Sequence, residues 1–304
     1  MRSHRKFSKN KYTIIAFAII LVLFLLVRYT DILPFEKEHA SKVKEKKEFI
    51  SSGYNIVHFL NAGQGDCTLI ETIDGKYALI DASTQDYSDK VVKYLKDQGV
   101  SELEYVFFTH PHEDHIGGGN EVLDRFKVKN VIMTKRTENT SAYTHLTKSI
   151  KKSKEKYGTK VISPKTGDVF MLSDSAFTII SDGKGYDDLN NSSICIKIEL
   201  GESSFLFTGD AEKIVEERIL KSGADIDADV YKCAHHGSST SNTEEFIDEI
   251  TPDYAIVSCG KDNDYGHPHR EVVSALNERN IPMLITHEEG DILIGYNAHS
   301  IIVK

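Results

Sequence analysis

Residues 110–115 read His-Pro-His-Glu-Asp-His, which places three imidazoles and two carboxylates within six residues, directly after an apolar run. Packing alone does not account for this group, because crowded polar rings and like charges destabilise a fold unless something binds them. Imidazole nitrogen and carboxylate oxygen together suit zinc, manganese or iron. His110 and His112 are two residues apart, so an extended backbone points both rings the same way. Asp114 and His115 follow a turn and can face a second ion, whereas the alternative is a solvated histidine-rich loop.

Two later apolar runs also end in side chains that bind metals. Residues 205–207 lead into Thr-Gly-Asp210, and residues 231–233 lead into Ala-His235-His236-Gly. The alternation of side chains along a strand cannot decide which histidine of the pair reaches a metal, because a turn begins there. We expect one of the two rings to ligate and the other to hydrogen-bond the substrate or a carboxylate.

The pattern HxHxDHxGG at residues 110–118 resembles the signature of the metallo-β-lactamase superfamily, and LFTGD at 206–210 and HHGS at 235–238 extend the resemblance. It implies an α/β fold, a four-layer αββα sandwich, and two divalent metal ions that share Asp210. The ions, with zinc expected first and manganese as the alternative, would activate a bridging hydroxide as the nucleophile. The implied catalytic carboxylates are Asp114 and Asp210.

The resemblance also divides the ligands between the two ions. The first ion would have His110, His112 and Asp210. The second ion would have Asp114, His115, Asp210 and one of His235 and His236. With three protein ligands and water, the first site is expected to bind its ion more weakly than the second. Many superfamily enzymes place a further histidine ligand before the bridging aspartate, whereas the only histidine in that interval here is His145, in a Lys-rich helical pattern.

A finer resemblance is to the extracellular hydrolase domain of ComEC-type competence proteins and its stand-alone relatives. GQGD at 63–66, NSSI at 191–194 and NDYGHP at 263–268 carry it. Asn61 and Cys67 depart from the pattern, since Asp, and Ser or Ala, usually stand there, but neither is a proposed ligand. The resemblance implies a nuclease-type hydrolase that acts on the phosphodiester bonds of DNA or of an envelope polymer.

Three other functions compete with this one. The first is a phosphodiesterase on cell-envelope components such as phosphorylcholine or teichoic acid. The second is hydrolysis of an amide or lactone, which the missing intermediate histidine and the HHGS motif disfavour. The third is a non-catalytic, tethered binding module, which the otherwise complete ligand set disfavours. No protein partner is inferred.

Residues outside the ligand set are expected to contact the substrate or to orient the ligands. His267 could bind a phosphoryl oxygen or protonate the leaving oxygen, and Arg270 could add a bidentate phosphate contact from the first turn of a helix. A Pro-initiated helix start with exposed side chains is the alternative for this segment. Asp66 and Asp81 are expected to fix loop or imidazole orientation, or only to cap turns. The candidate substrate-binding residues are His236, His267, Arg270 and Asn191.

The net charge of −9 is unevenly distributed along the chain. Six of the 37 basic residues lie in residues 1–30, which contain no acidic residue, so the other 31 face 46 acidic residues and give −15. A body this acidic is a poor general polyanion binder, and nucleic acid would need a local basic patch or bridging metal ions. The Lys-rich helical pattern over 144–160 is the visible basic patch. It is explained either by a solvated helix face or by a contact with DNA, teichoic acid or anionic lipid.

Residues 14–27 form an unbroken apolar run inside the segment 12–29. About 18–20 residues cross a bilayer core as a helix, and the basic segment before the run predicts an inside N-terminus. We therefore expect a basic cytoplasmic tail over 1–11, a single-pass transmembrane signal anchor over 12–29, a charged stalk over 30–53 and an extracellular hydrolase domain over 54–304. Secretion after signal cleavage is the alternative, although no small-x-small cleavage site follows the run.

From Tyr54 onward, short β-rich runs mix with helical patterns, which predicts one domain with two sheets covered by helices. The expected strands span residues 55–60, 67–72, 76–81, 105–108, 130–133, 176–180, 194–200, 204–208, 230–233, 254–258, 283–286 and 292–296. The expected helices span residues 90–98, 120–126, 142–157, 211–221, 243–250 and 269–279.

Overall fold

The structure, a computed structural model, describes residues 44–304. The compact body comprises Phe49–Lys304, so it begins within the segment expected to be stalk. Phe49 explains the earlier start, because its ring is buried with Ile56 and Leu293. The expected cytoplasmic tail, the transmembrane helix and most of the stalk lie outside the described residues. Within residues 44–304, no helix combines the length and the apolar character needed to cross a bilayer.

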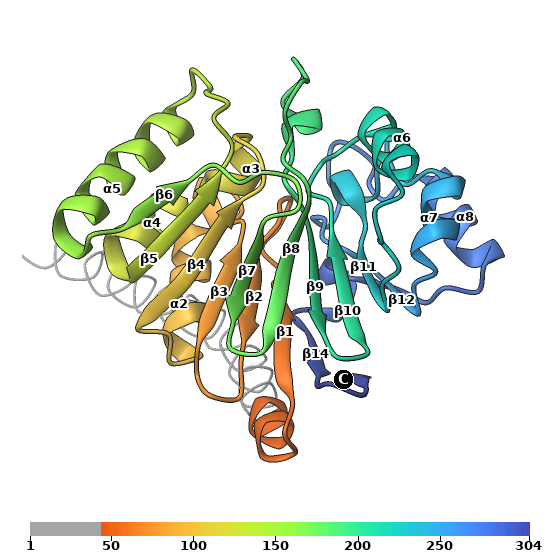
Figure 1. Cartoon of the computed structure of the whole chain (residues 1–304), viewed down its shortest axis with the longest axis horizontal. Coiled ribbons are helices and arrows are strands. Elements are labelled where there is room, and N and C mark those ends of the chain that lie inside the picture. The colour runs from red at the N-terminus through yellow and green to blue at the C-terminus, as the bar shows by residue number, and fades with distance from the viewer. Residues whose placement is uncertain (1–43) are drawn as a thin grey trace, which may run out of the picture. The chain divides into compact units, whose positions relative to one another are not determined.

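The body contains two β-sheets that face each other, with helices on the outer side of each (Figure 1). In spatial order, the first sheet consists of β15 (Ile301–Val303), β14 (Ile292–Tyr296), β1 (Asn55–Phe59), β2 (Thr68–Glu71), β3 (Tyr77–Ile80), β4 (Glu102–Phe108), β5 (Lys127–Met133) and β6 (Lys160–Ile162). The second sheet consists of β13 (Met283–Ile285), β12 (Tyr254–Val257), β11 (Val230–Lys232), β10 (Ser203–Phe207), β9 (Cys195–Leu200), β8 (Ser175–Ser181) and β7 (Val169–Leu172).

The longer helices form one outer layer over each sheet. The layer on the first sheet consists of α2 (Ser88–Asp97), α4 (Gly119–Arg125) and α5 (Ser141–Tyr157). The layer on the second sheet consists of α6 (Lys213–Ser222), α7 (Glu244–Ile250) and α8 (Arg270–Glu278). The short helical turns are η1 (Gln85–Tyr87), α3 (Glu113–Ile116), η2 (Asn190–Ser192), η3 (Ala234–Gly237) and α9 (Thr286–Glu289).

Apolar side chains fill the space between the two sheets and the space under each helical layer. Between the sheets, the ring of Phe107 in β4 stacks on Phe177 in β8 with 5.6 Å between centroids, and Phe59 in β1 stacks on Phe207 in β10 at 5.8 Å. Val106, next to Phe107, faces the opposite way and packs under the helices of the first sheet. Strands buried on both faces read as almost continuous apolar runs. The order helix, sheet, sheet, helix is the expected αββα sandwich.

The expected elements are all present, with ends that differ by up to three residues. Three strands were not predicted: β6, β7 and β15. Each lies at an edge of its sheet and is mostly exposed or half-buried. An edge strand has a neighbour on one side only and buries little surface, so its apolar pattern is weak. The missed strands are therefore short edge strands that are defined by pairing with one neighbour and not by an apolar pattern of their own.

The loops that carry the predicted ligands follow parallel strands. β3 and β4 run parallel in the first sheet, and β10, β11 and β12 run parallel in the second. Their carboxyl ends lie along the edge of the sandwich where α3 is found, at the top of Figure 1. In α/β proteins, ligands bind at this end of parallel strands. The fold therefore brings loops from both sheets to one place.

Candidate metal centre

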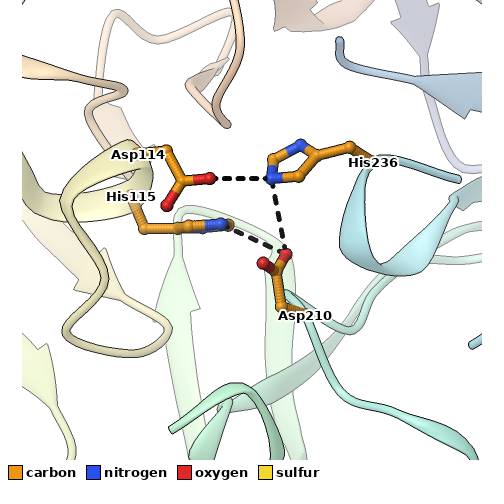
Figure 2. A group of neighbouring side chains, drawn as sticks. All are labelled: Asp114, His115, Asp210 and His236. Atoms are coloured by element: carbon orange, nitrogen blue, oxygen red, sulfur yellow. Dashed lines mark hydrogen bonds and ion pairs between the residues drawn. The ribbon is translucent and has the colours of Figure 1, made fainter. Parts of the chain in front are cut away.

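Four side chains from three separate segments meet at this edge (Figure 2). Asp114 and His115 lie in α3, Asp210 follows β10, and His236 lies in η3. His115 Nε2 lies 3.1 Å from Asp210 Oδ1. His236 Nε2 lies 3.2 Å from Asp114 Oδ2 and 3.7 Å from Asp210 Oδ1. The four ligand atoms lie within 4.8 Å of one another, so a single ion can contact all of them.

His110 and His112 form a second group with the same aspartate. His110 Nε2 lies 3.1 Å from His112 Nδ1 and 3.7 Å from Asp210 Oδ2. Two nitrogen ligands of a tetrahedral zinc, each bonded at about 2.0–2.1 Å, lie about 3.3 Å apart, so the spacing of the two rings fits a shared ion. Asp210 offers Oδ1 to one group and Oδ2 to the other. Its carboxylate therefore lies between two adjoining subsites.

Two ligand atoms of the four-residue group are buried without a hydrogen-bond partner, as expected for a metal site. Neither His115 Nε2 nor Asp210 Oδ1 makes a hydrogen bond with any residue that the structure describes. Buried polar atoms without partners are destabilising unless a ligand contacts them. Imidazole and carboxylate donors in this combination suit divalent transition-metal ions. The side chains present therefore fit a pair of divalent ions.

The charges in this cluster are balanced by one another. Burial acts to lower the pKa of His115, but the carboxylates of Asp210 and Asp81 outweigh it and raise that pKa well above its usual value. Burial acts to raise the pKa of Asp210, but His115 and His236 lower it well below its usual value. Divalent ions can replace the protons on such imidazoles, because metal ligands must be deprotonated.

Asp81 orients His115 from the side away from the ligand group. Its Oδ2 lies 2.8 Å from His115 Nδ1, and its carboxylate also accepts hydrogen bonds from the backbone N–H and the hydroxyl of Thr109. Since a carboxylate only accepts, His115 keeps a proton on Nδ1 and directs Nε2 at Asp210. This contact is of the kind expected for Asp81 from the sequence, and its effect on metal binding stays a prediction.

Asp66 lies behind His236 in a buried ion pair. Its carboxylate oxygens are each 2.9 Å from Lys232 Nζ, and its Oδ1 lies 3.3 Å from His236 Nδ1. Burial acts to raise the pKa of Asp66, but Lys232 and His236 outweigh it and keep that pKa low. Lys232 was not singled out from the sequence. The available signal was a lone cation inside an apolar run, which implies a buried counter-charge.

Two glycines allow the loops around the cluster to approach each other. Gly209 has φ +54°, and a Cβ there would lie 2.9 Å from Ser193 Oγ and 3.0 Å from Thr109 Cβ. Gly65 has φ +149°, and its Cβ would lie 2.4 Å from the carbonyl oxygen of Asp114. A side chain at either position would push apart segments that carry ligands. Glycine is therefore required by the close contact as well as by φ.

The two adjacent histidines have different surroundings. His235 Nε2 lies 3.8 Å from Asp210 Oδ2 and 3.5 Å from Asn190 Nδ2, and its Nδ1 lies 3.1 Å from Thr240 Oγ1. Its side chain is 22% exposed, whereas that of His236 is 2% exposed. His236 belongs to the four-residue group and His235 does not. The structure thus places His236 in the group that could hold an ion and His235 on the more exposed side of it, and the ligand role of either ring stays a prediction.

His267 lies beside this histidine pair. The centroid of its ring is 5.7 Å from that of His235 and 6.2 Å from that of His236, and the exposed ring of Tyr265 stacks on it at 5.5 Å. Burial, with help from the neighbouring imidazoles, lowers the pKa of His267 to about 4. Its Nδ1 is buried and has no hydrogen-bond partner among residues 44–304. A neutral ring therefore lies next to the ligand group with one nitrogen available.

The other two candidate substrate-binding residues lie differently. Arg270 is the first residue of α8 and is exposed, and no contact within residues 44–304 links it to the ligand group. Asn191 is buried, and its amide donates to Asp188 Oδ1 and Glu212 Oε2 and accepts from the backbone N–H of Glu212. Substrate contacts from Arg270 and Asn191 stay predictions. The neighbouring Asn190, which was not predicted, is the one that contacts His235.

A buried amide that the sequence did not reveal holds the loop of His236. Asn242 Oδ1 accepts hydrogen bonds from the backbone N–H of Ala234 and from the hydroxyl of Tyr231. Its Nδ2 donates to the carbonyl oxygens of Ala234 and Ser238. Glu216, on the buried face of α6, in turn accepts from the backbone N–H of Asn242. All the hydrogen-bonding groups of the Asn242 amide are used to fix this turn.

The chain matches a protein-family model, and it aligns with part of much longer competence proteins. Residues 60–261 match the family model described as the metallo-beta-lactamase superfamily. The chain is 30% identical over 258 residues to "ComE operon protein 3" of Bacillus subtilis, a match that covers 79% of this chain and 33% of that protein. It is 27% identical over 259 residues to "Competence protein ComA" of Neisseria gonorrhoeae, covering 84% of this chain and 34% of that protein.

These matches confirm the resemblance to ComEC-type competence proteins, although the chain spans about a third of the length of these relatives. Among solved structures, a mutant of CmlA beta-hydroxylase is similar with a TM-score of 0.52 at 13% identity, over 79% of this chain and 53% of that chain. At that identity the likeness concerns the fold alone. It agrees with the αββα arrangement described above.

Proposed function

The chain belongs to the metallo-β-lactamase superfamily, and from the geometry of its ligand cluster we propose that it is a dinuclear-metal hydrolase of phosphodiester bonds. The observation that carries the proposal is Asp210, whose two oxygens face two different groups of imidazoles. Such a shared carboxylate suits two neighbouring divalent ions, for which zinc is our first choice and manganese the alternative. A single structural ion would need only one of the two groups.

When bound, a pair of divalent ions polarises the oxygens of a substrate and lowers the pKa of water to about 7. In hydrolysis, the oxygen of water forms the new bond to phosphorus, the bond to the leaving oxygen breaks, and the leaving oxygen takes up a proton. Asp81 and Asp66 hold the ligand rings of His115 and His236 in place for this reaction. His267, beside the ligands, would donate its N–H to a phosphoryl oxygen, because a neutral ring with a pKa of about 4 suits this role better than transfer of a proton to the leaving oxygen.

Phosphodiesters are favoured as substrates by the kinship with competence proteins and by the ligand set. The first subsite has two imidazoles and Asp210, whereas many superfamily enzymes have a further histidine ligand, and its absence disfavours hydrolysis of an amide or lactone. The second candidate function is a phosphodiesterase on envelope material such as teichoic acid or phosphorylcholine. The acidic body, with −15 over residues 31–304, favours small or envelope substrates over duplex DNA.

The test is a substrate panel on the full chain in neutral detergent, loaded with zinc or manganese. The panel contains bis-p-nitrophenyl phosphate, single-stranded DNA, p-nitrophenyl phosphorylcholine and nitrocefin, and Asp210→Ala serves as the control because it removes a ligand from both subsites. We expect hydrolysis of phosphodiesters that is lost in Asp210→Ala. Hydrolysis of nitrocefin alone would contradict the proposal, and metal binding without any hydrolysis would indicate a binding module.

His267 is tested separately from the metals. If it contacts the substrate, His267→Ala lowers turnover of bis-p-nitrophenyl phosphate while the metal content per chain stays the same. Unchanged turnover at full metal content would remove His267 from the reaction. The same measurement on Arg270→Ala and Asn191→Ala decides their expected substrate contacts.

We propose further that residues 12–29 anchor the chain in the cell membrane, with the hydrolase domain outside. The support is the apolar run with basic residues before it. Fractionation should place the full-length chain with membranes, and protease added to intact cells should remove the hydrolase domain. A soluble form shortened by about 30 residues would show instead that the segment is a cleaved signal.

A further inference from the structure

A cavity of about 390 Å³ lies between the loop that follows β5 and the loop that follows β8. Both loops rise at the edge of the sandwich that carries the metal centre (Figure 1). Cationic, aromatic and acidic side chains line the cavity. The main ones are Lys135, Arg136, Asp182, Lys184, Tyr186 and Asp187. Its volume is in the range of sites that hold a small ligand or one unit of a polymer.

The cavity adjoins the metal centre through both loops. Arg136 also lines a small cavity whose wall includes His110, a ligand of the first subsite. The loop after β8 continues from the cavity to Asn190, which contacts His235, and then to Ser193, whose hydroxyl lies 3.3 Å from His110 Nδ1. A substrate that extends beyond the metal centre can therefore follow either loop into the cavity.

Two basic side chains of the lining have unused donors. Lys135 is exposed, and no hydrogen bond or ion pair holds its ammonium group within residues 44–304. Arg136 uses Nη2 to donate to the carbonyl oxygen of Asp187, while its Nε is buried with no acceptor among the described residues. The hydroxyl of Tyr186, also in the lining, is buried without a partner. Such atoms are expected to contact water or a ligand.

The acidic side chains in the lining do not neutralise the positive charges of Lys135 and Arg136. Asp182 is paired with Lys184, with 2.6 Å between carboxylate and Nζ, so the two side chains neutralise each other. The remaining acid of the lining is Asp187, a single negative charge against the two positive charges of Lys135 and Arg136. The cavity thus has a local excess of positive charge on a body whose net charge is strongly negative.

The basic face of α5 offers a contrast to the cavity. Its lysines lie opposite the buried residues Ala142, Leu146 and Ile150, and point to solvent. Lys152 is paired with Asp124 at 2.9 Å, and Lys156 lies over the ring of Tyr157. This arrangement fits a solvated helix face. No side-chain donor of α5 is buried without a partner.

We propose that the cavity between the β5 and β8 loops is an anion subsite, which binds a phosphate group next to the one being hydrolysed. The proposal rests on the proposed function, since it assumes a substrate with successive phosphodiesters. Lys135 and Arg136 supply charge-assisted hydrogen bonds to the phosphate oxygens. The metal centre takes the scissile phosphate and the cavity takes its neighbour, so polymers are favoured over single phosphodiesters.

The first experiment measures binding without hydrolysis. The full chain in neutral detergent and chelator is titrated with a fluorescent single-stranded DNA oligonucleotide and with a glycerol-phosphate oligomer, at several salt concentrations. We expect Lys135→Ala and Arg136→Ala to raise Kd about tenfold and to reduce the salt slope by about 0.7 for each phosphate that is no longer neutralised. Lys154→Ala, on the exposed face of α5, is the matched control and should bind as wild type does. The two probes show which polymer the subsite prefers.

The second experiment measures hydrolysis by the metal-loaded chain. Lys135→Ala should lower kcat/KM on the polymer about tenfold and leave that on bis-p-nitrophenyl phosphate unchanged, because this compound has a single phosphate. Arg136→Ala also removes the hydrogen bond from Arg136 to the carbonyl oxygen of Asp187, which could alter the loop. Lys135 makes no hydrogen bond or ion pair within the described part of the chain, so Lys135→Ala tests the charge of the cavity without that structural change. Equal loss of activity on both substrates, or loss in Lys154→Ala as well, would overturn the subsite.

The two proposals fail in different ways. If no variant and no wild-type chain hydrolyses a phosphodiester, but oligomer binding still depends on Lys135, the hydrolase proposal fails and the anion subsite stands. If phosphodiesters are hydrolysed and the Lys135 and Arg136 variants behave as wild type in both experiments, the subsite fails alone. Wild-type chain that shows no salt-dependent binding of either oligomer also overturns the subsite.

Discussion

The Nδ1 atom of His236 lies 2.9 Å from the carbonyl oxygen of Ser258, which follows β12. A carbonyl oxygen only accepts, so this nitrogen carries a proton and Nε2 is turned to Asp114 and Asp210. His235, one residue earlier, has no such backbone contact and faces a hydroxyl at Nδ1. The difference between two neighbouring histidines is thus set by a strand that lies further along the chain.

The first prediction concerns this histidine pair. His236→Ala should lose the metal of the four-ligand subsite, because one of its four ligands is removed. His235→Ala should keep both ions and lose activity, since its ring lies on the open side of the cluster. Elemental analysis of the two purified variants, with activity measured in parallel, checks both statements. Equal loss of metal in the two variants would mean that both rings are ligands.

The second prediction concerns removal of the metals. The subsite of His110, His112 and Asp210 has three protein ligands and the other has four, so dialysis against a weak chelator should remove about one ion per chain before the second. His112→Ala should abolish the weaker class of sites and keep the tighter one. Two ions that leave together, at the same chelator concentration, would contradict the difference between the subsites.

The third prediction concerns Asp81. In Asp81→Asn, an amide nitrogen at the Oδ2 position would face His115 Nδ1, whereas the opposite orientation would turn it against the backbone N–H of Thr109. The first orientation favours the wrong tautomer of His115, with the proton on the nitrogen that should face the metal, and the second leaves two donors facing each other. Metal affinity should fall about 10–100-fold, as measured by competition with a chromophoric chelator. Asp86→Asn, at an exposed position in η1, is the matched control and should bind metal as wild type does.

The fourth prediction concerns Glu216 and pH. Burial raises the pKa of Glu216 above its usual value of 4.5, even though Thr243 and Asn242 donate hydrogen bonds to the carboxylate. The folded state therefore binds the Glu216 proton more tightly than the unfolded state does. The resulting stabilisation is fully present below pH 4.5 and is lost as pH rises through the folded pKa.

Glu216→Gln cannot ionise at this position, so comparing it with wild type isolates the contribution of Glu216 to the pH dependence of stability. Its amide would also face the N–H groups that now donate to the carboxylate, at a cost of about 1–3 kcal/mol. The difference in free energy of unfolding between wild type and Glu216→Gln should be largest at low pH and shrink as pH rises. Urea unfolding at several pH values measures it. A difference that does not change with pH would show that Glu216 has its usual pKa.

The fifth prediction concerns the buried pair of Lys232 and Asp66. Lys232→Met leaves the Asp66 carboxylate buried without its cation, which should lower the free energy of unfolding by about 3–5 kcal/mol. The double variant Lys232→Met with Asp66→Asn removes both charges and should recover part of that loss. Urea unfolding of the single and double variants checks the coupling. If the double variant is less stable than Lys232→Met, the ion pair does not explain the effect.

The sequence by itself was sufficient for the fold and for most of the residues that the structure brings together in the candidate metal centre. Strands such as β4 and β10 have largely buried apolar runs, which are visible without knowledge of their neighbours. Each run ends directly in chemically distinctive residues, His110 after β4 and Asp210 after β10. Local order along the chain therefore revealed which loops would carry the metal centre. The edge strands were missed because they are defined by pairing and not by their own pattern.

Only the tertiary structure decided how these residues divide their roles. His235 and His236 have the same side chain and adjacent positions, and contacts with Ser258 and Asp66 distinguish them. Lys232 and Asn242 contact partners that only folding brings close, Asp66 and the backbone of Ala234. No spacing in the sequence therefore predicts these contacts. The cavity lined by Lys135 and Arg136 likewise arises where two loops from different sheets meet. Long-range packing, and not local sequence, determines which polar atoms are satisfied and which are left to bind a ligand.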